Sequence, residues 1–399
     1  MENKNSALTV TPSMNWNLDP SVIYLNHGAF GACPLEIINE QRHWHQRLES
    51  SPLRFILREI DEKLYESKHA LSRFIDTDTN GLALVPNATH GVNTILKSLD
   101  FKPGDEVLIT NHIYPACRNV LFYILETKGI KIKEIELPLG EINSQLIINS
   151  VMEAVTPATR LVMLDHVTSP TALVFPVTEI VKELNRRGIE SLIDGAHAPG
   201  SIPLSIKTIN PTYYTGNCHK WMCLPKNCGF LWVREEARSK VVPLAISHAW
   251  GKETSFEKKF HWQGTADWSA ALTLPYAIRF FEKQMPGGWD EWMERNHQMT
   301  IEARGVICNY LGLKPICSTS MLASMAVIPI AAKADPINLG YNTIDRIQEQ
   351  LYQKYNIEVP LFQWTGAHQL LLRISSQQYN TLSQFHYLAE SLDLIISNK

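Results

Sequence analysis

Ser191-Leu-Ile-Asp-Gly-Ala-His197 is an apolar run that ends in an aspartate, and Tyr213-Tyr-Thr-Gly-Asn-Cys-His-Lys-Trp221 is a second run that passes into a polar loop. Each run has the length and composition of a buried β-strand. The first presents Asp194 at its end, and the second presents His219 and Lys220. Because neighbouring strands of a parallel sheet end at the same edge, we expect the carboxyl and the amine to face one another.

Short apolar runs alternate with longer amphipathic segments from about residue 82 to residue 234. This alternation predicts a mostly parallel sheet with helices on both faces. The expected strands are Leu82–Val85, Glu106–Ile109, Lys131–Glu136, Leu161–Leu164, Glu190–Ile193, Tyr213–Thr215 and Gly229–Val233. The helices expected between them include Thr89–Leu99, Pro115–Lys128, Ser144–Ala154 and Pro176–Arg187.

After Pro275 the pattern changes to long amphipathic helices with strands between them. We expect helices at Trp289–Leu311, Thr343–Tyr355 and Leu382–Ile396, and strands at Ala323–Ile328, Ile357–Pro360 and Gln369–Ile374. A helix over Glu36–Phe74 is expected to run along the first lobe. The predicted fold is therefore α/β, with a mostly parallel seven-stranded sheet in a large domain (31–275), a smaller C-terminal α+β domain (276–399), and an N-terminal segment (1–30) at the active site.

Composition limits the classes of function. The chain has 37 Lys plus Arg against 40 Asp plus Glu, so its net charge of −3 offers no general attraction for nucleic acid or membranes. The first twenty residues contain no apolar core of a signal peptide, which predicts a cytoplasmic protein. The seven cysteines are expected to be free thiols, and the five-residue spacing of Cys218, Cys223 and Cys228 matches no common metal site, so no metal is predicted.

An acid and an amine at neighbouring strand ends suit one cofactor in particular. Pyridoxal 5'-phosphate needs a lysine to hold its aldehyde as a Schiff base, and a carboxylate beside its ring nitrogen. Lys220 and Asp194 have the residue types and the placement for these two tasks. The sequence lacks the motifs of a P-loop nucleotidase, a dinucleotide-binding enzyme and a GxSxG hydrolase.

Six motifs in order resemble fold-type I pyridoxal-phosphate enzymes of the aminotransferase class V family, and within it the isopenicillin N epimerase-like branch. They span residues 24 to 380, which is nearly the whole chain. The motifs are Tyr24-Leu-Asn-His-Gly-Ala-Phe-Gly31, Asn87-Ala-Thr-His-Gly-Val-Asn93, Asp194-Gly-Ala-His197, His219-Lys220-Trp221, Gln263-Gly-Thr-Ala-Asp267, and Leu372-Arg-Ile-Ser375 with Tyr379-Asn380.

The resemblance implies a role for each residue around the cofactor. Lys220 would be the catalytic residue, binding the cofactor aldehyde and then moving the Cα proton. Asp194 would pair with the ring nitrogen, and His197 would approach the phenolic oxygen. The phosphate would be bound by Ala88 and Thr89 at a helix start, by Thr215 and His219, and by Gly264 and Thr265 of a second subunit in a homodimer with shared active sites.

The remaining site residues follow strand ends or the N-terminal motif. Tyr114, preferred over His112, would stack on the ring, and His166 would lie at its opposite edge. Arg373 would bind the substrate carboxylate, because an arginine within an apolar strand needs an anionic partner. Asn26, His27 and Gly28 would assist it at the substrate.

The sequence constrains the type of reaction less strongly than it constrains the cofactor. We expect epimerase-like Cα proton chemistry on an amino acid, as in the branch that the chain resembles. A carbon–sulfur (β-elimination) lyase, a cysteine desulfurase-like enzyme, an aminotransferase and a non-catalytic binding protein stay open. Many relatives have arginine where this chain has Ala266, which points to a different substrate.

Overall fold

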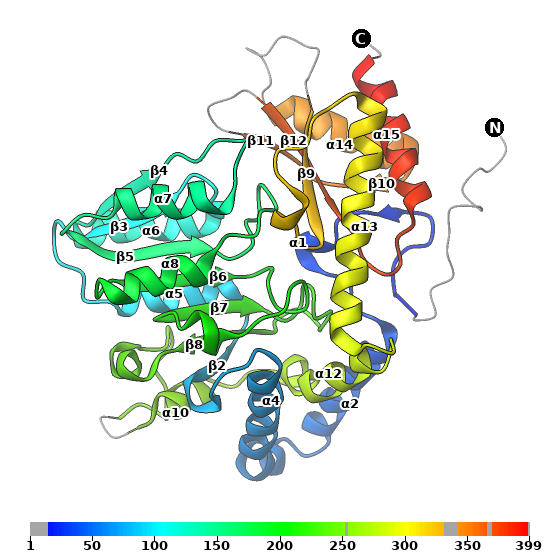
Figure 1. Ribbon diagram of the computed structural model, residues 1–399. Coiled ribbons are helices and arrows are strands. Elements are labelled where there is room, and N and C mark those ends of the chain that lie inside the picture. Colours follow the sequence, from blue (N-terminus) through cyan, green and yellow to red (C-terminus); the bar gives the residue numbers. More distant parts are fainter. Residues whose placement is uncertain (1–14, 252–253, 331–340, 365–368, 398–399) are drawn as a thin grey trace.

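The computed structural model describes residues 15–251, 254–330, 341–364 and 369–397. A large sheet with its helices lies beside a smaller group of strands and helices, and the long helix α13 (Gly288–Leu311) borders both (Figure 1). This is the α/β fold expected from the alternation of strands and helices. Within the described ranges, no helix is both long and apolar enough to span a bilayer.

The large sheet has seven strands in the order β2-β8-β7-β6-β5-β3-β4. The strands from β4 to β7 in this order run parallel, and β8 is antiparallel to both of its neighbours. All seven strands predicted from the sequence are present. Their bounds are β2 Leu82–Val85, β3 Glu106–Thr110, β4 Lys131–Ile135, β5 Thr159–Asp165, β6 Glu190–Gly195, β7 Tyr213–Asn217 and β8 Gly229–Val233.

Helices cover both faces of this sheet, which explains why its strands are apolar on both sides. One face packs against α5 (Ala88–Ser98), α6 (Pro115–Lys128) and α10 (Phe256–His261). The other face packs against a larger set of helices. These are α4 (Ile60–Phe74), α7 (Ser144–Ala154), α8 (Val177–Arg186), α9 (Ile206–Ile209) and α12 (Leu274–Glu282).

The smaller group contains a three-stranded antiparallel sheet in the order β11-β12-β9. Its strands pack with the C-terminal half of α13 around one apolar cluster. The bounds of its elements are β9 Met325–Ile330, α14 Tyr341–Tyr355, β10 Ile357–Glu358, β11 Leu361–Trp364, β12 Gln369–Ser375 and α15 Leu382–Ser397. Strand β11 was not predicted, since the one strand expected in this region was Ile357–Pro360.

The expected domain boundary at residue 275 stays a proposal. Trp289 and Trp292, in the first turns of α13, belong to the cluster beneath the large sheet, whereas Ala303 and Ile307 belong to the cluster of the smaller group. The packing therefore changes from one cluster to the other along this helix, which stands upright in Figure 1.

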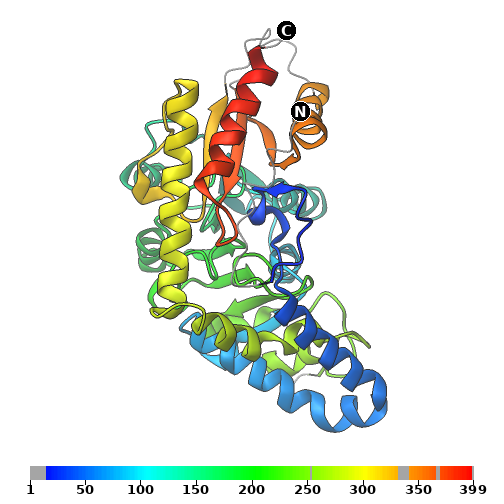
Figure 2. The ribbon, with the colours of Figure 1, turned by 90° about the vertical axis from the view of Figure 1, so that its right-hand side faces the viewer.

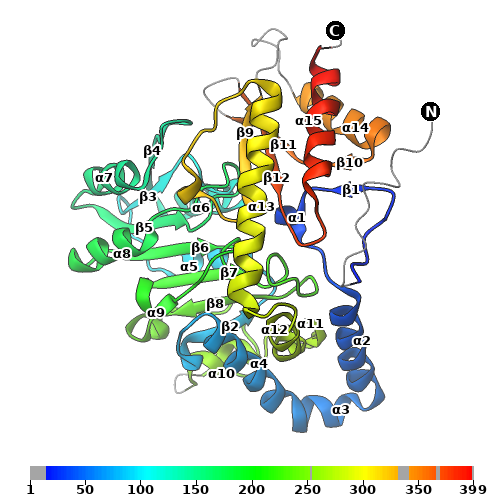
Figure 3. The same cartoon turned by 45° about the vertical axis from the view of Figure 1, so that its right-hand side comes forward.

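The N-terminal segment joins the two parts of the molecule. Strand β1 (Ile23–Tyr24) pairs in parallel with β10, and the short helix α1 (His27–Phe30) follows it toward the ends of the large sheet's strands (Figures 1 and 3). The single helix expected over Glu36–Phe74 was wrong.

Instead, α2 (Leu35–Ser50), α3 (Pro52–Arg54), a π-helical turn (Phe55–Glu59) and α4 form a bent arm, which extends away from the smaller group in Figure 2. The break falls at Ser51, whose extended φ of −158° ends α2, and Pro52 lacks the N–H that would continue it. The π-turn adds a second irregularity before α4 begins.

Candidate active site

A cavity of about 200 Å³ lies where β5, β6 and β7 end. The start of α5 and the end of α1 close it from two other sides. Its lining residues are Ala29, Phe30, Asn87, Ala88, Thr89, Tyr114, Asp165, Ser169, Asp194, Ala196, His197, Asn217, His219 and Lys220. The Asp194 and Lys220 of the two sequence runs therefore meet at one site, as predicted.

Lys220 follows β7 and points its amine at a histidine. Its Nζ lies 3.0 Å from Nε2 of His197. Burial lowers the pKa of Lys220 from 10.5 to about 7, with the nearby guanidinium of Arg373 acting in the same direction. A substantial fraction of Lys220 is therefore a neutral, nucleophilic amine at neutral pH.

The hydrogen bonds of His197 assign its tautomer. Indole Nε1 of Trp221 can only donate, and it donates to Nδ1 of His197 at 3.4 Å. Nδ1 is therefore the acceptor, and the proton of the neutral ring lies on Nε2. Burial holds the pKa of His197 well below its usual value, so the ring is neutral and its Nε2–H donates to the Lys220 amine.

Asp194 lies near the end of β6 and is 2% exposed. Its Oδ1 accepts the backbone N–H of Ala196 at 3.0 Å, and its Oδ2 accepts the thiol of Cys117 at 3.3 Å. Burial raises the pKa of Asp194, whereas these two donors and the charge of Lys220 act against the rise. These two hydrogen bonds hold the carboxyl at the cavity wall, where it can meet a cationic ring nitrogen.

The first turn of α5 provides an anion-binding edge. The side chain of Asn87 caps the helix by accepting the N–H of His90 at 2.9 Å, and Asn217 accepts the N–H of Ala88 at 2.8 Å. Thr89 lies between them and lines the cavity. Backbone N–H groups at the start of a helix favour phosphate, and the Thr89 hydroxyl adds a donor.

The N-terminal segment fixes the backbone of Lys220. Nε2–H of His27 donates to the carbonyl of Lys220 at 3.0 Å, and Nδ1 accepts the hydroxyl of Tyr379 at 3.0 Å. Burial lowers the pKa of His27 to about 3, so this bridge is neutral. Gly31 has a φ of +71°, and a Cβ there would collide with the backbone of His219 and Lys220, so only glycine fits this contact.

Arg373 is buried in β12, and among the described residues it has no acidic partner. Its Nη1 donates to the carbonyl of Ser169 at 2.7 Å, and its guanidinium carbon lies 5.0 Å from the ring centre of Phe362. Its buried Nε has no hydrogen-bond partner within the described residues. Burial lowers the pKa of Arg373 to about 10, so it stays cationic at neutral pH and can still bind an anion.

The residues predicted from the sequence divide into two groups. Those that line the cavity are Ala88, Thr89, Tyr114, Asp194, His197, His219 and Lys220. Those that do not are Asn26, His27, Gly28, His166, Thr215, Gly264, Thr265 and Arg373. Arg373 nevertheless contacts the lining residue Ser169, and His27 contacts the carbonyl of Lys220.

Two different features keep His166 and Thr215 out of the cavity: side-chain direction for His166, and cover by α5 for Thr215. His166 bonds the hydroxyl of Tyr214 through Nδ1 at 2.9 Å, whereas its neighbour Asp165 lines the cavity, as expected when successive residues of an extended chain face opposite ways. Thr215 donates to the carbonyl of Phe230 at 2.7 Å and lies beneath α5, which approaches it at Gly91.

Asn26 and Gly28 belong to the packing of the N-terminal segment. The side chain of Asn26 meets Glu358 of β10, and the N–H of Gly28 donates to Oγ of Ser375 at 3.1 Å. The next residues of α1, Ala29 and Phe30, line the cavity in their place.

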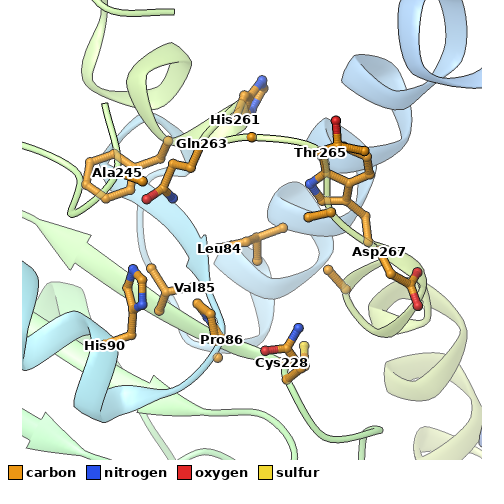
Figure 4. A pocket seen from close by; sticks show the side chains of 17 residues that line it. Leu84, Val85, Pro86, His90, Cys228, Ala245, His261, Gln263, Thr265 and Asp267 are labelled. Carbon is orange, nitrogen blue, oxygen red and sulfur yellow. The ribbon is translucent and has the colours of Figure 1, made fainter. Parts of the chain in front are cut away.

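Gly264 and Thr265 line a second cavity, of about 260 Å³ (Figure 4). In the figure, Gln263, Thr265 and Asp267 lie on a loop across from Val85 and Pro86 of the β2 end and His90 of α5. Thr265 is exposed, and neither residue lines the cavity of Lys220 in its own chain. Their predicted contribution to a second subunit's phosphate site stays a prediction.

Sequence reasoning missed Asp165, Ser169 and Asn217, together with Ala29, Phe30 and Ala196 as lining residues. A signal was present for two of them. Asp165 ends a predicted parallel strand next to that of Asp194, and Asn217 lies two residues beyond Thr215 on the same side of β7. Ser169 and the α1 residues are placed by long-range packing and carry no local signal.

The aminotransferase class-V family model matches residues 23–341 of the chain. The chain belongs to the aminotransferase class-V family. The family resemblance seen in the six motifs is thereby confirmed.

Three relatives show the range of this similarity. The probable chloroplastic L-cysteine desulfhydrase of Arabidopsis thaliana is 28% identical over 95% of this chain and 84% of its own length. Isopenicillin N epimerase of Streptomyces clavuligerus is 27% identical over 95% of this chain and 96% of its own. A solved complex of the cystine C–S lyase C-DES with its reaction product cysteine persulfide has a TM-score of 0.79 at 21% identity, covering 92% of this chain and 96% of that one, which confirms the fold.

Class-V enzymes depend on pyridoxal phosphate, so the cofactor predicted from the sequence is confirmed. The residues fit this group on three independent points. Lys220 is an amine with a pKa near 7, Asp194 is a buried carboxyl in the same cavity, and Thr89 stands at a helix start beside them. An aldehyde, a ring nitrogen and a phosphate require these three kinds of partner.

Proposed function

We propose that this protein is a pyridoxal-phosphate-dependent carbon–sulfur lyase that removes the Cα proton of an L-amino acid and eliminates a sulfur group from Cβ. The observation that carries the proposal is the amine of Lys220, with its pKa of about 7 and its contact with His197. A base works best when its pKa lies near the working pH. When bound, the cofactor supplies an electron-withdrawing ring that stabilises negative charge at the α-carbon.

Arg373 supports an amino-acid substrate. A buried guanidinium with a free Nε next to the cavity wall is suited to a carboxylate, and its planar fork can bind both oxygens. Phe362 supports the guanidinium from one face, and Ser169 supports it from the cavity side. Binding at this position would orient the α-carboxylate and bring the Cα–H bond toward Lys220.

The cysteines argue against a desulfurase mechanism. All seven lie within the described residues, and none of them lines the cavity. The two outside the large domain, Cys308 and Cys317, have their thiol pKa raised by burial, and Cys317 is held by Arg304. A desulfurase needs an accessible nucleophilic thiolate, so we favour direct elimination of the sulfur group.

Epimerisation is the second candidate, as the Streptomyces clavuligerus relative suggests. It requires a second acid–base group on the opposite side of Cα, for which Tyr114 is one lining residue of suitable type. Burial raises the pKa of Tyr114, so it stays a neutral phenol and is a weaker proton donor than an ordinary tyrosine. Elimination needs only Lys220, and the similarity to a cysteine desulfhydrase favours it.

Product analysis distinguishes the two reactions. The purified protein is incubated in deuterated water with L-cysteine, L-cystine and long-chain amino acids, with Lys220→Ala as the control. We expect a sulfur amino acid to give pyruvate, ammonia and a sulfur product, and Lys220→Ala to give none. A deuterated D-amino acid without pyruvate would reject the lyase proposal and favour epimerisation. A borohydride-treated sample should carry the cofactor on Lys220.

We further propose that the working unit is a two-fold homodimer. Phe30 lines the cavity and yet is 71% exposed, and Leu53 and Leu57 on the bent arm are 74% and 64% exposed. Large exposed apolar side chains of this kind are typical of an interface. The loop of Gly264 and Thr265 would then complete the phosphate site of the other subunit.

A further inference from the structure

A second carboxyl shares the cavity with Asp194. Asp165 ends β5, and the β5–β6 pairing places it directly opposite Asp194. Residues paired in neighbouring parallel strands lie about 5 Å apart with side chains on the same face. Both carboxyls line the cavity, and Asp165 is only 5% exposed.

The two carboxyls differ in their hydrogen bonds. Both oxygens of Asp194 accept, from Ala196 and from Cys117. The backbone N–H of Tyr114 faces the carboxyl of Asp165, but its buried Oδ2 has no partner within the described residues. A buried, ionised oxygen without a donor is unfavourable, whereas a protonated oxygen is itself a donor.

The groups around the cavity do not supply enough positive charge to neutralise two ionised carboxylates. Lys220, after β7, is the cation facing Asp165, and its own pKa is about 7. From α6, the thiol of Cys117 has its pKa raised by burial and by the two aspartates. Strand β3, the other neighbour of β5, contributes the uncharged Thr110 at its end. Burial and the charge of Asp194 raise the pKa of Asp165 well above its usual value.

We propose that Asp165 and Asp194 act as a carboxyl pair that holds one proton, in which Asp165 is the neutral acid and Asp194 carries the charge. Asp165 is thus a positioning residue. It keeps the charge facing the cofactor's ring nitrogen at one unit and presents an O–H to the cavity. This deepens the proposed cofactor chemistry, but the protonation of Asp165 can be tested without any turnover.

Infrared spectroscopy tests the proposal directly. Spectra of the protein as purified and after removal of the cofactor are compared with those of Asp165→Asn, Asp194→Asn and Glu358→Gln. We expect a protonated-carboxyl C=O band at pH 7 in wild type that is lost in Asp165→Asn. Glu358, a half-buried glutamate outside this cavity with a pKa also raised by burial, is the control, and its substitution should leave this band in place.

Stability provides a second readout. An acid whose pKa is raised by folding loses its proton in the unfolded chain first, so the wild type should lose stability relative to Asp165→Asn as the pH rises from 4. The Tm of Asp165→Asn minus that of wild type should therefore increase as the pH rises from 4 toward neutral.

Two results would overturn the proposal. The first is a band that survives in Asp165→Asn, including one that is lost only in Asp194→Asn, and the second is a Tm difference that does not change with pH. An enzyme with a different reaction but the expected band and Tm trend would refute the lyase proposal and leave the carboxyl pair intact.

Discussion

The amine of Lys220 lies 3.0 Å from Nε2 of His197, whose other ring nitrogen is occupied by the indole N–H of Trp221. Since Trp221 cannot accept a hydrogen bond, the order of donors is fixed from Trp221 to His197 to Lys220. A protonated lysine has no lone pair with which to accept from Nε2–H. The arrangement therefore stabilises the neutral amine in addition to the effect of burial.

Lys220 should react with aldehydes at a lower pH than an ordinary lysine. Its pKa is lowered to about 7, so its reactivity should rise up to about pH 7 and level off above it. The cofactor-free protein is treated with a small aldehyde and cyanoborohydride, and modification of Lys220 is followed by mass spectrometry. Nα-acetyllysine in the same reaction has the ordinary pKa of about 10.4, and a Lys220 profile that follows it would contradict the prediction.

Replacing His197 should shift this profile to higher pH. His197→Leu removes the donor to the neutral amine, so the pKa of Lys220 should rise toward its ordinary value. His197→Gln keeps an N–H donor and should stay closer to wild type. The measurement is the pH of half-maximal modification. Equal shifts in the two variants would show that His197 acts only through packing.

Arg373→Ala should impair the reaction through substrate binding. Losing one partner of a buried charge pair costs about 3–5 kcal/mol, so kcat/KM should fall by roughly two to four orders of magnitude. Phe362→Leu removes only the ring beneath the guanidinium and should cost about tenfold or less. Both variants are assayed with an amino acid and with its carboxamide. A carboxamide that loses as much as the acid would exclude a carboxylate-binding role.

Gly31→Ala should destabilise the protein and disturb Lys220. The new Cβ would collide with the backbone of His219 and Lys220 at a φ of +71°, so we expect a loss of more than about 1 kcal/mol in the free energy of unfolding. Gly305→Ala, on α13 with open space around it, should instead gain about 0.5–1 kcal/mol. Urea unfolding measures both. A neutral Gly31→Ala would mean that the α1 turn can move away from Lys220.

Mixed dimers should test the shared site. Lys220→Ala and Thr265→Val chains are each expected to be impaired alone, the second in cofactor binding. In a hybrid dimer, one site combines an intact Lys220 with an intact Thr265 from the other chain. Unfolding and refolding an equal mixture should restore about a quarter of wild-type activity, because half of the dimers are hybrids with one working site. Activity that is merely the average of the two parents would place Thr265 outside the shared site.

The sequence by itself determined the seven strands of the large sheet and the meeting of Asp194 with Lys220. Both follow from local rules, because buried strands are continuous apolar runs and parallel strands end at one edge. The residue types of Asp194 and Lys220 predicted the cofactor, and the family motifs supported it. The expected long helix breaks at Ser51, and Pro52 in the sequence already indicated this break.

Only the tertiary structure decided which residues face the cavity. His166 was predicted and its neighbour Asp165 lines the site, because a one-residue difference along a strand reverses the side chain. His27 contacts the carbonyl of Lys220, 193 positions away in the chain, and Arg373 reaches Ser169 across 204. Such contacts depend on how β1 and β12 dock against the large sheet, and no local pattern encodes that docking.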